Sequence, residues 1–361
     1  QKEILIKMNK NYLITTGGSG GHVIPAVILY EHLSRDAKVI ITTDKRGLKY
    51  LNDENYKLRI IDTPRLNNIF LFPINFILVI ILTIKSFLLL KKNNIEKLFS
   101  TGGYMSLPLL LAAKFLRLNI YLVEPNQVLG RANKFFLSSC KKIICYKEKI
   151  KNFPSKYKNK IETIFPLVRE KFYSLKQKNF NHRKINLLIV GGSQGANIFD
   201  INLKNKIVNI SKKLPIRILQ QTNEKNIINL KNFYDENNVE CLVFSFNKNF
   251  EEIINNSDVC ITRSGASTLA ELSLLNIPFI AVPLPSSKDN HQFENALFYK
   301  EKECCWILNQ ETFEDNIEQL LTNILSDNSE FLQKKKNLKK LNYKNTWTNV
   351  NQKILNIINE N

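Results

Sequence analysis

The sequence predicts an α/β protein made of two Rossmann-like parallel-sheet domains that face each other across a cleft. The chain has 361 residues, too many for one small core, and two domains of roughly 150–200 residues fit that length. Short apolar strands alternate with amphipathic helices, which is typical of parallel sheets covered by helices on both faces. A glycine-rich turn follows a strand twice, at residues 17–21 and 191–195, so the same layout is expected in each half.

The elements follow from this alternation. Strands are expected at residues 12–16, 38–43, 97–100, 120–123, 185–190, 241–244, 259–262 and 279–282. Helices are expected between them, among others at residues 23–34, 106–116 and 196–212. Residues 166–184 are polar and basic without a clear period, which suits a linker. Because ligands bind outside the carboxyl ends of parallel strands, both glycine loops should face the cleft.

The charge and cysteine content of the chain limit the classes of function that it can have. The 52 Lys and Arg against 32 Asp and Glu give a formal net charge of +20, which attracts nucleic acid, anionic lipid headgroups or phosphorylated substrates. No nucleic-acid recognition motif is present, so no nucleic-acid partner is predicted. The six cysteines form no C-x-x-C pair, which favours buried, reduced thiols in a cytosolic protein. The first apolar segment runs straight into a glycine loop, so it indicates a strand and no secretory signal.

The apolar segment at residues 69–90 has three interpretations. It is long enough to span a membrane, but Pro73, Asn75 and Lys85 interrupt it. It is therefore a buried core helix, an interfacial helix that dips into one leaflet, or a membrane span. The flanking basic residues Arg65 and Lys91–Lys92 favour the interfacial helix, because they can meet anionic headgroups.

Three motifs of the first half follow strands. In the G-G-S-G-G-H motif of residues 17–22, loop and helix N–H groups suit an oxyanion or phosphate, and His22 is either a base or a structural cap. The T-G-G-Y-M-S motif of residues 101–106 is either a second contact to an anionic ligand or a plain turn. Glu124 is a candidate base or base-orienting carboxylate, and Asn126 a candidate contact to a sugar hydroxyl, unless both lie in a solvated loop.

The second half holds the longest motif. Ser193 lies in a loop that opens a helix and can donate to a phosphate. Residues 264–268 offer small side chains and amides to a diphosphate, and Glu271 can accept both ribose hydroxyls. Gln292 and Asn295 lie three apart on one helix face and could bind sugar hydroxyls. Any one of these features could be structural, but their ordered combination indicates a nucleotide-sugar site.

Together these motifs resemble the MurG family, the bacterial GT-B enzymes of glycosyltransferase family 28. The matching residues read G-G-S-G-G-H, T-G-G-Y, E-P-N, G-G-S-Q-G-A, R-S-G-A-S-T-x-A-E and P-L-P-x-x-x-D-N-H-Q, in order between about residues 12 and 300. The resemblance implies a GT-B fold and inverting transfer of N-acetylglucosamine from UDP-N-acetylglucosamine. The acceptor would be the C4 hydroxyl of undecaprenyl-pyrophosphoryl-N-acetylmuramyl-pentapeptide, in peptidoglycan synthesis. It also implies peripheral attachment to anionic lipids at the cytoplasmic face of the bacterial inner membrane, and other cell-wall synthesis proteins as partners.

The resemblance further implies that the two domains bind different substrates. Residues 1–167 would hold the lipid acceptor and the membrane side, with a last helix at 345–361 packing back, and residues 168–344 would hold the donor. The catalytic residues would be His22 and Glu124. The donor contacts would be Ser19, Gly20, Gly21, Asn126, Arg169, Ser193, Asn247, Ala266, Ser267, Thr268, Leu269, Ala270, Glu271 and Gln292.

This chain departs from the family pattern at several positions. Ser19 stands where the family usually has Thr, and Val123 stands where it usually has His. Of the family's G-N-P-V-R pattern, only Val168 and Arg169 remain.

The predicted mechanism is a single in-line displacement with His22 as base. The amides of residues 264–268 and Arg263 or Arg169 would stabilise the UDP leaving group. No D-x-D metal motif is present, so neither a metal site nor a cofactor is predicted. The alternatives are a glycolipid synthase, a non-catalytic UDP-sugar-binding regulator and a Rossmann dehydrogenase. Against a dehydrogenase, the first loop lacks G-x-G-x-x-G spacing, and no ribose-binding acidic residue is expected after the second strand.

Overall fold

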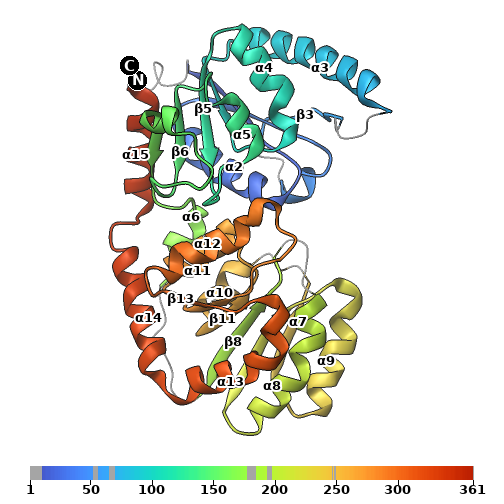
Figure 1. The fold of residues 1–361 in the computed structure, drawn as a ribbon, viewed down its shortest axis with the longest axis vertical. Helices are drawn as coiled ribbons and strands as arrows, with labels where there is room; N and C mark the ends of the chain where they lie inside the picture. Colours follow the sequence, from blue (N-terminus) through green and yellow to red (C-terminus); the bar gives the residue numbers. More distant parts are fainter. Residues whose placement is uncertain are drawn as a thin grey trace. The chain divides into compact units, whose positions relative to one another are not determined.

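The computed structural model describes residues 10–51, 56–64, 70–176, 184–192, 197–245, 247 and 249–360. The chain divides into two compact units (Figure 1). Unit 1 comprises Gln1–Leu167 and Trp347–Asn361, and unit 2 comprises Val168–Thr346. Each unit contains one parallel sheet.

The sheet of unit 1 has the strand order β3-β2-β1-β4-β5-β6-β7. Its strands are β1 (Asn11–Thr15), β2 (Lys38–Thr43), β3 (Leu58–Ile60), β4 (Lys97–Ser100), β5 (Asn119–Glu124), β6 (Lys142–Cys145) and β7 (Ile161–Thr163). The four strands predicted in this half are present. Prediction missed β3, β6 and β7, two of which have only three residues, too few to show an apolar period.

Helices cover the unit 1 sheet, and every neighbouring strand pair is parallel. The helices are α2 (Gly20–Leu33), α3 (Phe72–Lys92), α4 (Leu107–Phe115), α5 (Arg131–Phe136) and α15 (Trp347–Asn359), with short 3₁₀ turns at Leu48–Tyr50, Tyr104–Ser106 and Ser155–Lys160. The core consists mainly of aliphatic side chains of the central strands and of α4.

The sheet of unit 2 has the order β10-β9-β8-β11-β12-β13. Its strands are β8 (Ile185–Val190), β9 (Ile216–Gln221), β10 (Cys241–Phe244), β11 (Val259–Thr262), β12 (Phe279–Ala281) and β13 (Cys305–Ile307). The four predicted strands are again present, and prediction missed β9 and β13.

The helices of unit 2 include one departure from prediction. They are α6 (Glu170–Tyr173), α7 (Asn197–Asn202), α8 (Lys204–Ser211), α9 (Ile227–Glu236), α10 (Phe250–Asn255), α11 (Ala266–Leu274), α12 (His291–Lys300), α13 (Phe313–Ser326) and α14 (Asn328–Leu341), with 3₁₀ turns at Glu224–Asn226, Lys288–Asn290 and Gln310–Thr312. The single helix expected at residues 196–212 is wrong, because the chain forms α7 and α8 there. Leu203 stands between them, fully buried in the core.

The strand order reverses once in each sheet, between β1 and β4 in unit 1 and between β8 and β11 in unit 2. Two Rossmann-like parallel sheets are therefore confirmed. Loops that leave neighbouring strands in opposite directions open a crevice at such a point, and ligands of these folds bind there. The G-G-S-G-G-H and T-G-G-Y loops follow β1 and β4, so both lie at the reversal point of unit 1.

The last helix, α15, belongs to unit 1. The ammonium group of Lys97 donates to the Ile358 carbonyl at 2.6 Å, and the Tyr121 hydroxyl donates to the same oxygen at 3.2 Å. At the other end, the Trp347 ring stacks on the His32 ring with centroids 3.6 Å apart. These contacts tie the end of the chain to the first sheet.

We expect His32 to make unit 1 acid-labile. Burial lowers the pKa of His32 from 6.5 to about 4, so the unfolded chain gains a proton below pH 6.5 before the folded chain does. Stability is therefore complete above pH 6.5 and falls as the pH drops toward 4, by about 2 kcal/mol between pH 6.5 and 5. Urea unfolding at both pH values should show this loss in the wild type and a smaller loss in His32→Gln. Equal losses of stability in the wild type and in His32→Gln would show that His32 does not cause the acid lability.

Helix α3 lies against α4 in unit 1 (Figure 1). It is, by length and composition, the one helix among the described residues that could cross a membrane, and only 17% of its apolar window is buried. The exposed apolar side chains of α3 are Phe72, Ile74, Phe76, Ile77, Leu78, Ile80, Ile81, Ile84 and Leu88. A buried core helix, one of the three interpretations of this segment, is therefore wrong.

Candidate functional site

His22 lies in the first turn of α2, where the G-G-S-G-G-H loop becomes helical. Ser19 is the N-cap residue of this helix, and its carbonyl accepts the N–H groups of His22 and Val23 at 3.0 and 3.1 Å. The Nδ1 atom of His22 lies 2.8 Å from the Thr101 carbonyl oxygen. Since a carbonyl only accepts, Nδ1 carries the proton in the neutral ring, and Nε2 is the nitrogen that can take up another.

The T-G-G-Y loop supports the His22 ring. Gly102 and Gly103 both have a φ of +86°, and a Cβ atom on either would lie within 3.5 Å of the ring. A Cβ on Gly103 would also meet the Gly17 carbonyl oxygen at 3.1 Å. Glycine is therefore needed twice here, for the left-handed backbone and for the close approach. The two motifs that the sequence singled out separately form one structure around His22.

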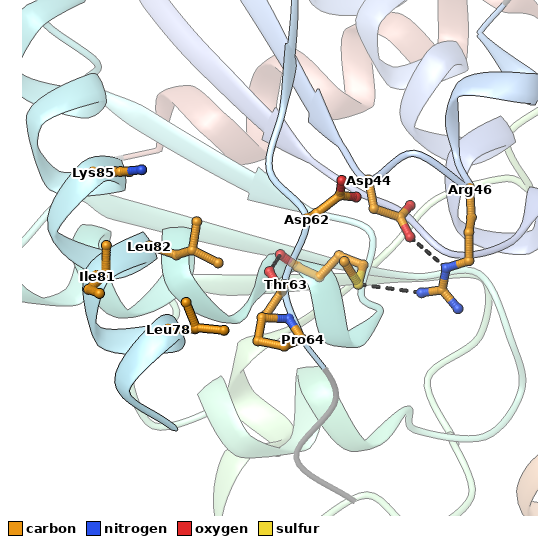
Figure 2. Close-up of a pocket in the computed structure, with 10 residues that line it drawn as sticks. Asp44, Arg46, Asp62, Thr63, Pro64, Leu78, Ile81, Leu82 and Lys85 are labelled. Atoms are coloured by element: carbon orange, nitrogen blue, oxygen red, sulfur yellow. Dashed lines mark hydrogen bonds and ion pairs between the residues drawn. The ribbon is translucent and has the colours of Figure 1, made fainter. Parts of the chain in front are cut away.

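Asp44 holds the first glycine loop from the end of β2. Its Oδ1 atom accepts the N–H groups of Gly18 at 2.8 Å and Gly47 at 3.0 Å, and its Oδ2 accepts Nε of Arg46 at 2.7 Å (Figure 2). Burial opposes ionisation, but these donors outweigh it and lower the pKa of Asp44. An acidic residue, Asp44, does follow the second strand, but the expectation that no acidic residue there binds a ribose is not contradicted. The Asp44 carboxylate is engaged by the protein itself, in an arrangement that does not leave it open to a ribose.

Glu124 is almost completely buried at the end of β5. Its Oε1 accepts the backbone and side-chain N–H groups of Asn126, both at 3.2 Å. Its Oε2 accepts the Gly130 N–H at 2.8 Å and the Asn133 amide at 3.0 Å. Burial raises the pKa of Glu124, and these four donors oppose the rise. The carboxylate thus fixes the loop between β5 and α5 and orients Asn126, and its role as a base or base-orienting carboxylate stays a prediction.

In unit 2, helix α11 begins at the reversal point between β8 and β11. Gly265 is its N-cap residue, and the first turn, Ala266–Thr268, is half-buried. Leu269 and Ala270 are buried in the core, so only their backbone could reach a ligand. The free N–H groups of this first turn form an anion-binding helix start.

Glu271 and Arg169, both predicted donor contacts, form an ion pair in unit 2, in which Glu271 is buried and Arg169 is partly exposed. The Nε and Nη2 atoms of Arg169 lie 3.0 and 2.8 Å from Oε1 of Glu271. Burial raises the pKa of Glu271, and the guanidinium opposes the rise. Both bonds use one carboxylate oxygen, so Oε2 is the oxygen with capacity for a ligand hydroxyl.

The side-chain amide oxygen of Gln292 is held by two backbone N–H groups. Its Oε1 accepts the N–H groups of Ser264 at 3.2 Å and Leu284 at 3.0 Å. The Nε2 group is therefore the part of this side chain that can donate to a sugar. The Oγ atom of Ser264, beside it, is buried without a hydrogen-bond partner among the described residues.

Two further side chains, those of Arg263 and Asn295, are engaged by hydrogen bonds within the protein. Arg263 donates to the Val282 carbonyl at 3.1 Å and to Gln310 at 2.6 Å, and its guanidinium lies over the Phe199 ring. Asn295 is buried and donates to the Ser264 carbonyl at 3.1 Å. The suggestion that Arg263 neutralises the leaving group is thus not supported, which leaves Arg169 for that role.

The remaining predicted contacts are placed as follows. Gly20 and Gly21 form the start of α2. Asn247 is half-buried, and its Oδ1 accepts the Asn249 N–H at 2.8 Å. Ser193 lies outside the described residues.

Two Rossmann-like units are the architecture of GT-B glycosyltransferases; here the first holds a histidine whose Nε2 can accept a proton, and the second a helix start beside a buried carboxylate. Comparison with known proteins agrees. Residues 12–145 match the glycosyltransferase family 28 N-terminal domain, and residues 186–349 match the family 28 C-terminal domain. The chain belongs to glycosyltransferase family 28.

Relatives in two bacteria carry the same name, UDP-N-acetylglucosamine–N-acetylmuramyl-(pentapeptide) pyrophosphoryl-undecaprenol N-acetylglucosamine transferase. The protein of Pelagibacter ubique is 51% identical over 98% of this chain and 100% of its own length. The protein of Rickettsia felis is 36% identical over 91% of this chain and 96% of its own.

Solved structures show the same fold. Acinetobacter baumannii MurG matches with a TM-score of 0.76 and 22% identity, over 97% of this chain and 99% of that one. Phytolacca americana UGT2, solved with UDP-2-fluoro-glucose and pterostilbene, matches with a TM-score of 0.69 and 12% identity, over 97% and 98%.

Proposed function

We propose that this chain transfers N-acetylglucosamine from UDP-N-acetylglucosamine to N-acetylmuramyl-(pentapeptide) pyrophosphoryl-undecaprenol, a step of peptidoglycan synthesis. The observation that carries the proposal is 51% identity, over 98% of the chain, to a relative named for this reaction. The His22 arrangement in unit 1 supports it, because transfer to a hydroxyl needs a base.

The reaction is a single displacement with inversion. Nε2 of His22 takes the proton of the acceptor C4 hydroxyl as that oxygen bonds to the anomeric carbon. The bond from the anomeric carbon to the diphosphate breaks at the same time, and UDP leaves with the electron pair. The hydrogen bond from Nδ1 to Thr101 supports this role, since it fixes the tautomer.

The donor binds mainly to unit 2. The N–H groups of the first turn of α11 bind the diphosphate, and Arg169 offsets its charge. Oε2 of Glu271 accepts from the ribose, and Nε2 of Gln292 donates to the sugar. The ion pair of Arg169 with Glu271 and the fixed Oε1 of Gln292 support these assignments, since each orients the group that binds.

The chain attaches to the membrane through α3 as an interfacial helix. A helix that crossed the bilayer once would place its ends on opposite sides, yet β3 and β4, before and after α3, belong to one sheet. The exposed apolar residues of α3 and the exposed Lys91 and Lys92 suit an anionic surface. Since its substrates are a cytoplasmic nucleotide sugar and a lipid, we place the enzyme at the cytoplasmic face of the inner membrane.

Replacing Ile77 and Ile84 together by Asp should weaken binding to anionic vesicles at least tenfold. Both side chains are more than half exposed, and burial of one isoleucine contributes about 1.5–3 kcal/mol. Vesicle sedimentation measures the binding. Ile228→Asp is the control, because Ile228 is 71% exposed on α9 in unit 2. Equal losses in both proteins would contradict docking through α3.

A panel of acceptors tests the proposed function. Purified enzyme and UDP-N-acetylglucosamine are incubated with a short-chain muramyl-pentapeptide pyrophosphoryl-prenol, with diacylglycerol, or with no lipid, and products are identified by mass spectrometry. We expect sugar only on the muramyl lipid. Sugar on diacylglycerol alone would show that the chain is a glycolipid synthase instead. UDP-sugar binding without any transfer would favour a non-catalytic UDP-sugar-binding regulator.

A further inference from the structure

The chain passes between the two units twice, and hydrogen bonds inside unit 2 join the two places of passage. Unit 2 begins at Val168 and ends at Thr346. Near its start, the Tyr173 hydroxyl donates to Oδ1 of Asn345, near its end, at 3.1 Å. The two residues are 172 positions apart in the sequence, and the sequence singled out neither as a site residue.

From Asn345 the hydrogen bonds continue to helix α11. Nδ2 of Asn345 donates to Oδ1 of Asn342 at 3.0 Å, and Nδ2 of Asn342 donates to the carbonyl and hydroxyl oxygens of Ser273, both at 2.9 Å. Ser273 lies in the last turn of α11, two residues after Glu271. Asn345 is buried, so leaving its amide without partners would be costly.

The first place of passage is tied to the same helix by Arg169, the N-cap residue of α6. The Arg169 guanidinium pairs with Glu271 of α11 at 2.8 Å and lies over the Phe172 ring, 5.0 Å from its centroid. Phe172 is buried in one core with residues of α11, and α6 packs against that helix (Figure 1). One end of α6 thus carries Arg169, and Asn345 holds the other end through Tyr173.

The side chains at its ends are expected to set the position of α6. It has only four residues, and so short a helix has little stability of its own. Its middle residue Lys171 lies 3.4 Å from Glu251, but the Lys171 side chain is 71% exposed, and exposed ion pairs contribute little. The bond between Tyr173 and Asn345 is therefore the polar contact that we expect to fix the C-terminal end of α6.

We infer that Tyr173 and Asn345 are positioning residues for the donor. By fixing α6 against α11, they hold the Arg169 guanidinium in the orientation in which it meets Glu271 and the UDP diphosphate. A side chain that is ordered before the ligand arrives loses less conformational entropy on binding. The inference rests on the proposed function, in which Arg169 offsets the charge of the diphosphate, and it requires no contact between Tyr173 and the donor.

Tyr173→Phe tests the inference, because it removes the hydroxyl and keeps the ring. In calorimetric titration we expect the Kd of UDP to rise about fivefold, equivalent to about 1 kcal/mol, a usual contribution of one hydrogen bond. Asn345→Ala should give a rise in the same direction. Neither variant should change kcat at saturating donor by more than about twofold, because a positioning residue for the donor acts on binding.

Tyr121→Phe is the matched control. Tyr121 is a buried tyrosine of unit 1 whose hydroxyl also joins segments that are far apart in the sequence, through the Ile358 carbonyl at 3.2 Å. It is not assigned to a substrate, so its loss should leave the Kd of UDP unchanged. An equal rise in Tyr121→Phe and Tyr173→Phe would assign the effect to general loss of stability and overturn the inference.

A double-mutant cycle with Arg169→Gln separates positioning from packing. In the Arg169→Gln background, Tyr173→Phe should change the Kd of UDP less than about 1.5-fold, because its effect passes through the guanidinium that is then absent. A fivefold rise in both backgrounds, or no rise in Tyr173→Phe and Asn345→Ala, would overturn the inference. A wild type that binds no UDP would reject the donor site and the inference with it. Coupling in the cycle without sugar transfer would support the positioning role and reject the reaction alone.

Discussion

Replacing His22 by Ala should lower kcat by about 10²–10⁴-fold, the usual contribution of a positioned general base. The affinity for UDP should stay within about threefold, because the donor is proposed to bind mainly to unit 2 and His22 is not among its contacts. The reason lies in the ring orientation: Nδ1 donates to the Thr101 carbonyl at 2.8 Å, which leaves Nε2 to accept the proton. Steady-state kinetics and UDP titration measure the two quantities.

His22→Asn distinguishes a base from a loop brace. The Asn amide can still donate to the Thr101 carbonyl but has no basic nitrogen, so we expect it to be as inactive as the Ala variant. Substantial activity in His22→Asn would show that the hydrogen bond to the loop is what matters and would remove His22 as the base.

Replacing Glu271 by Gln should raise the dissociation constant of UDP about 10–100-fold. A hydrogen bond to a charged group contributes about 1.5–3 kcal/mol, and Gln keeps the shape but not the charge. The substitution also removes the charged partner of Arg169, which lies 2.8 Å from Oε1. Calorimetric titration with UDP measures the effect, and kcat at saturating donor should fall much less than in His22→Ala.

Glu251→Gln is the matched control for this prediction. Glu251 is a second buried carboxylate of unit 2 and lies 3.4 Å from the Lys171 ammonium. It is not assigned to the donor site, so its loss should change UDP affinity less than threefold. Equal effects of the two substitutions would mean that general electrostatics of unit 2, and no specific contact of Glu271, controls the affinity.

The two-sheet fold could be predicted from the sequence because its central strands are continuous apolar runs followed by glycine turns. The strands that escaped prediction are mostly at the sheet edges, where β3 and β7 have three residues each and none of them is buried. Their pairing depends on neighbouring strands that lie far away in the sequence, so the local pattern carries little signal.

The sequence predicted which loops form the candidate site, but it predicted the role of each side chain in those loops less well. His22 and Glu271 were recognisable from their positions after strands. Whether a polar group is open to a ligand depends on its partners, and the sequence does not show them: the four donors around Glu124 and the backbone contacts of Arg263 come from folding. Asp44 could have been found, because an acidic residue directly after the second strand is a known position in Rossmann folds.

The most direct test of the central claim is transfer itself. Purified protein is mixed with radiolabelled UDP-N-acetylglucosamine and a short-chain muramyl-pentapeptide pyrophosphoryl-prenol, and label in the lipid fraction is counted for the wild type and for Glu271→Ala. We predict label in the lipid with the wild type and, at a donor concentration near the wild-type KM, at least tenfold less with the variant. Tight UDP-sugar binding by the wild type without label in the lipid would contradict the assigned reaction.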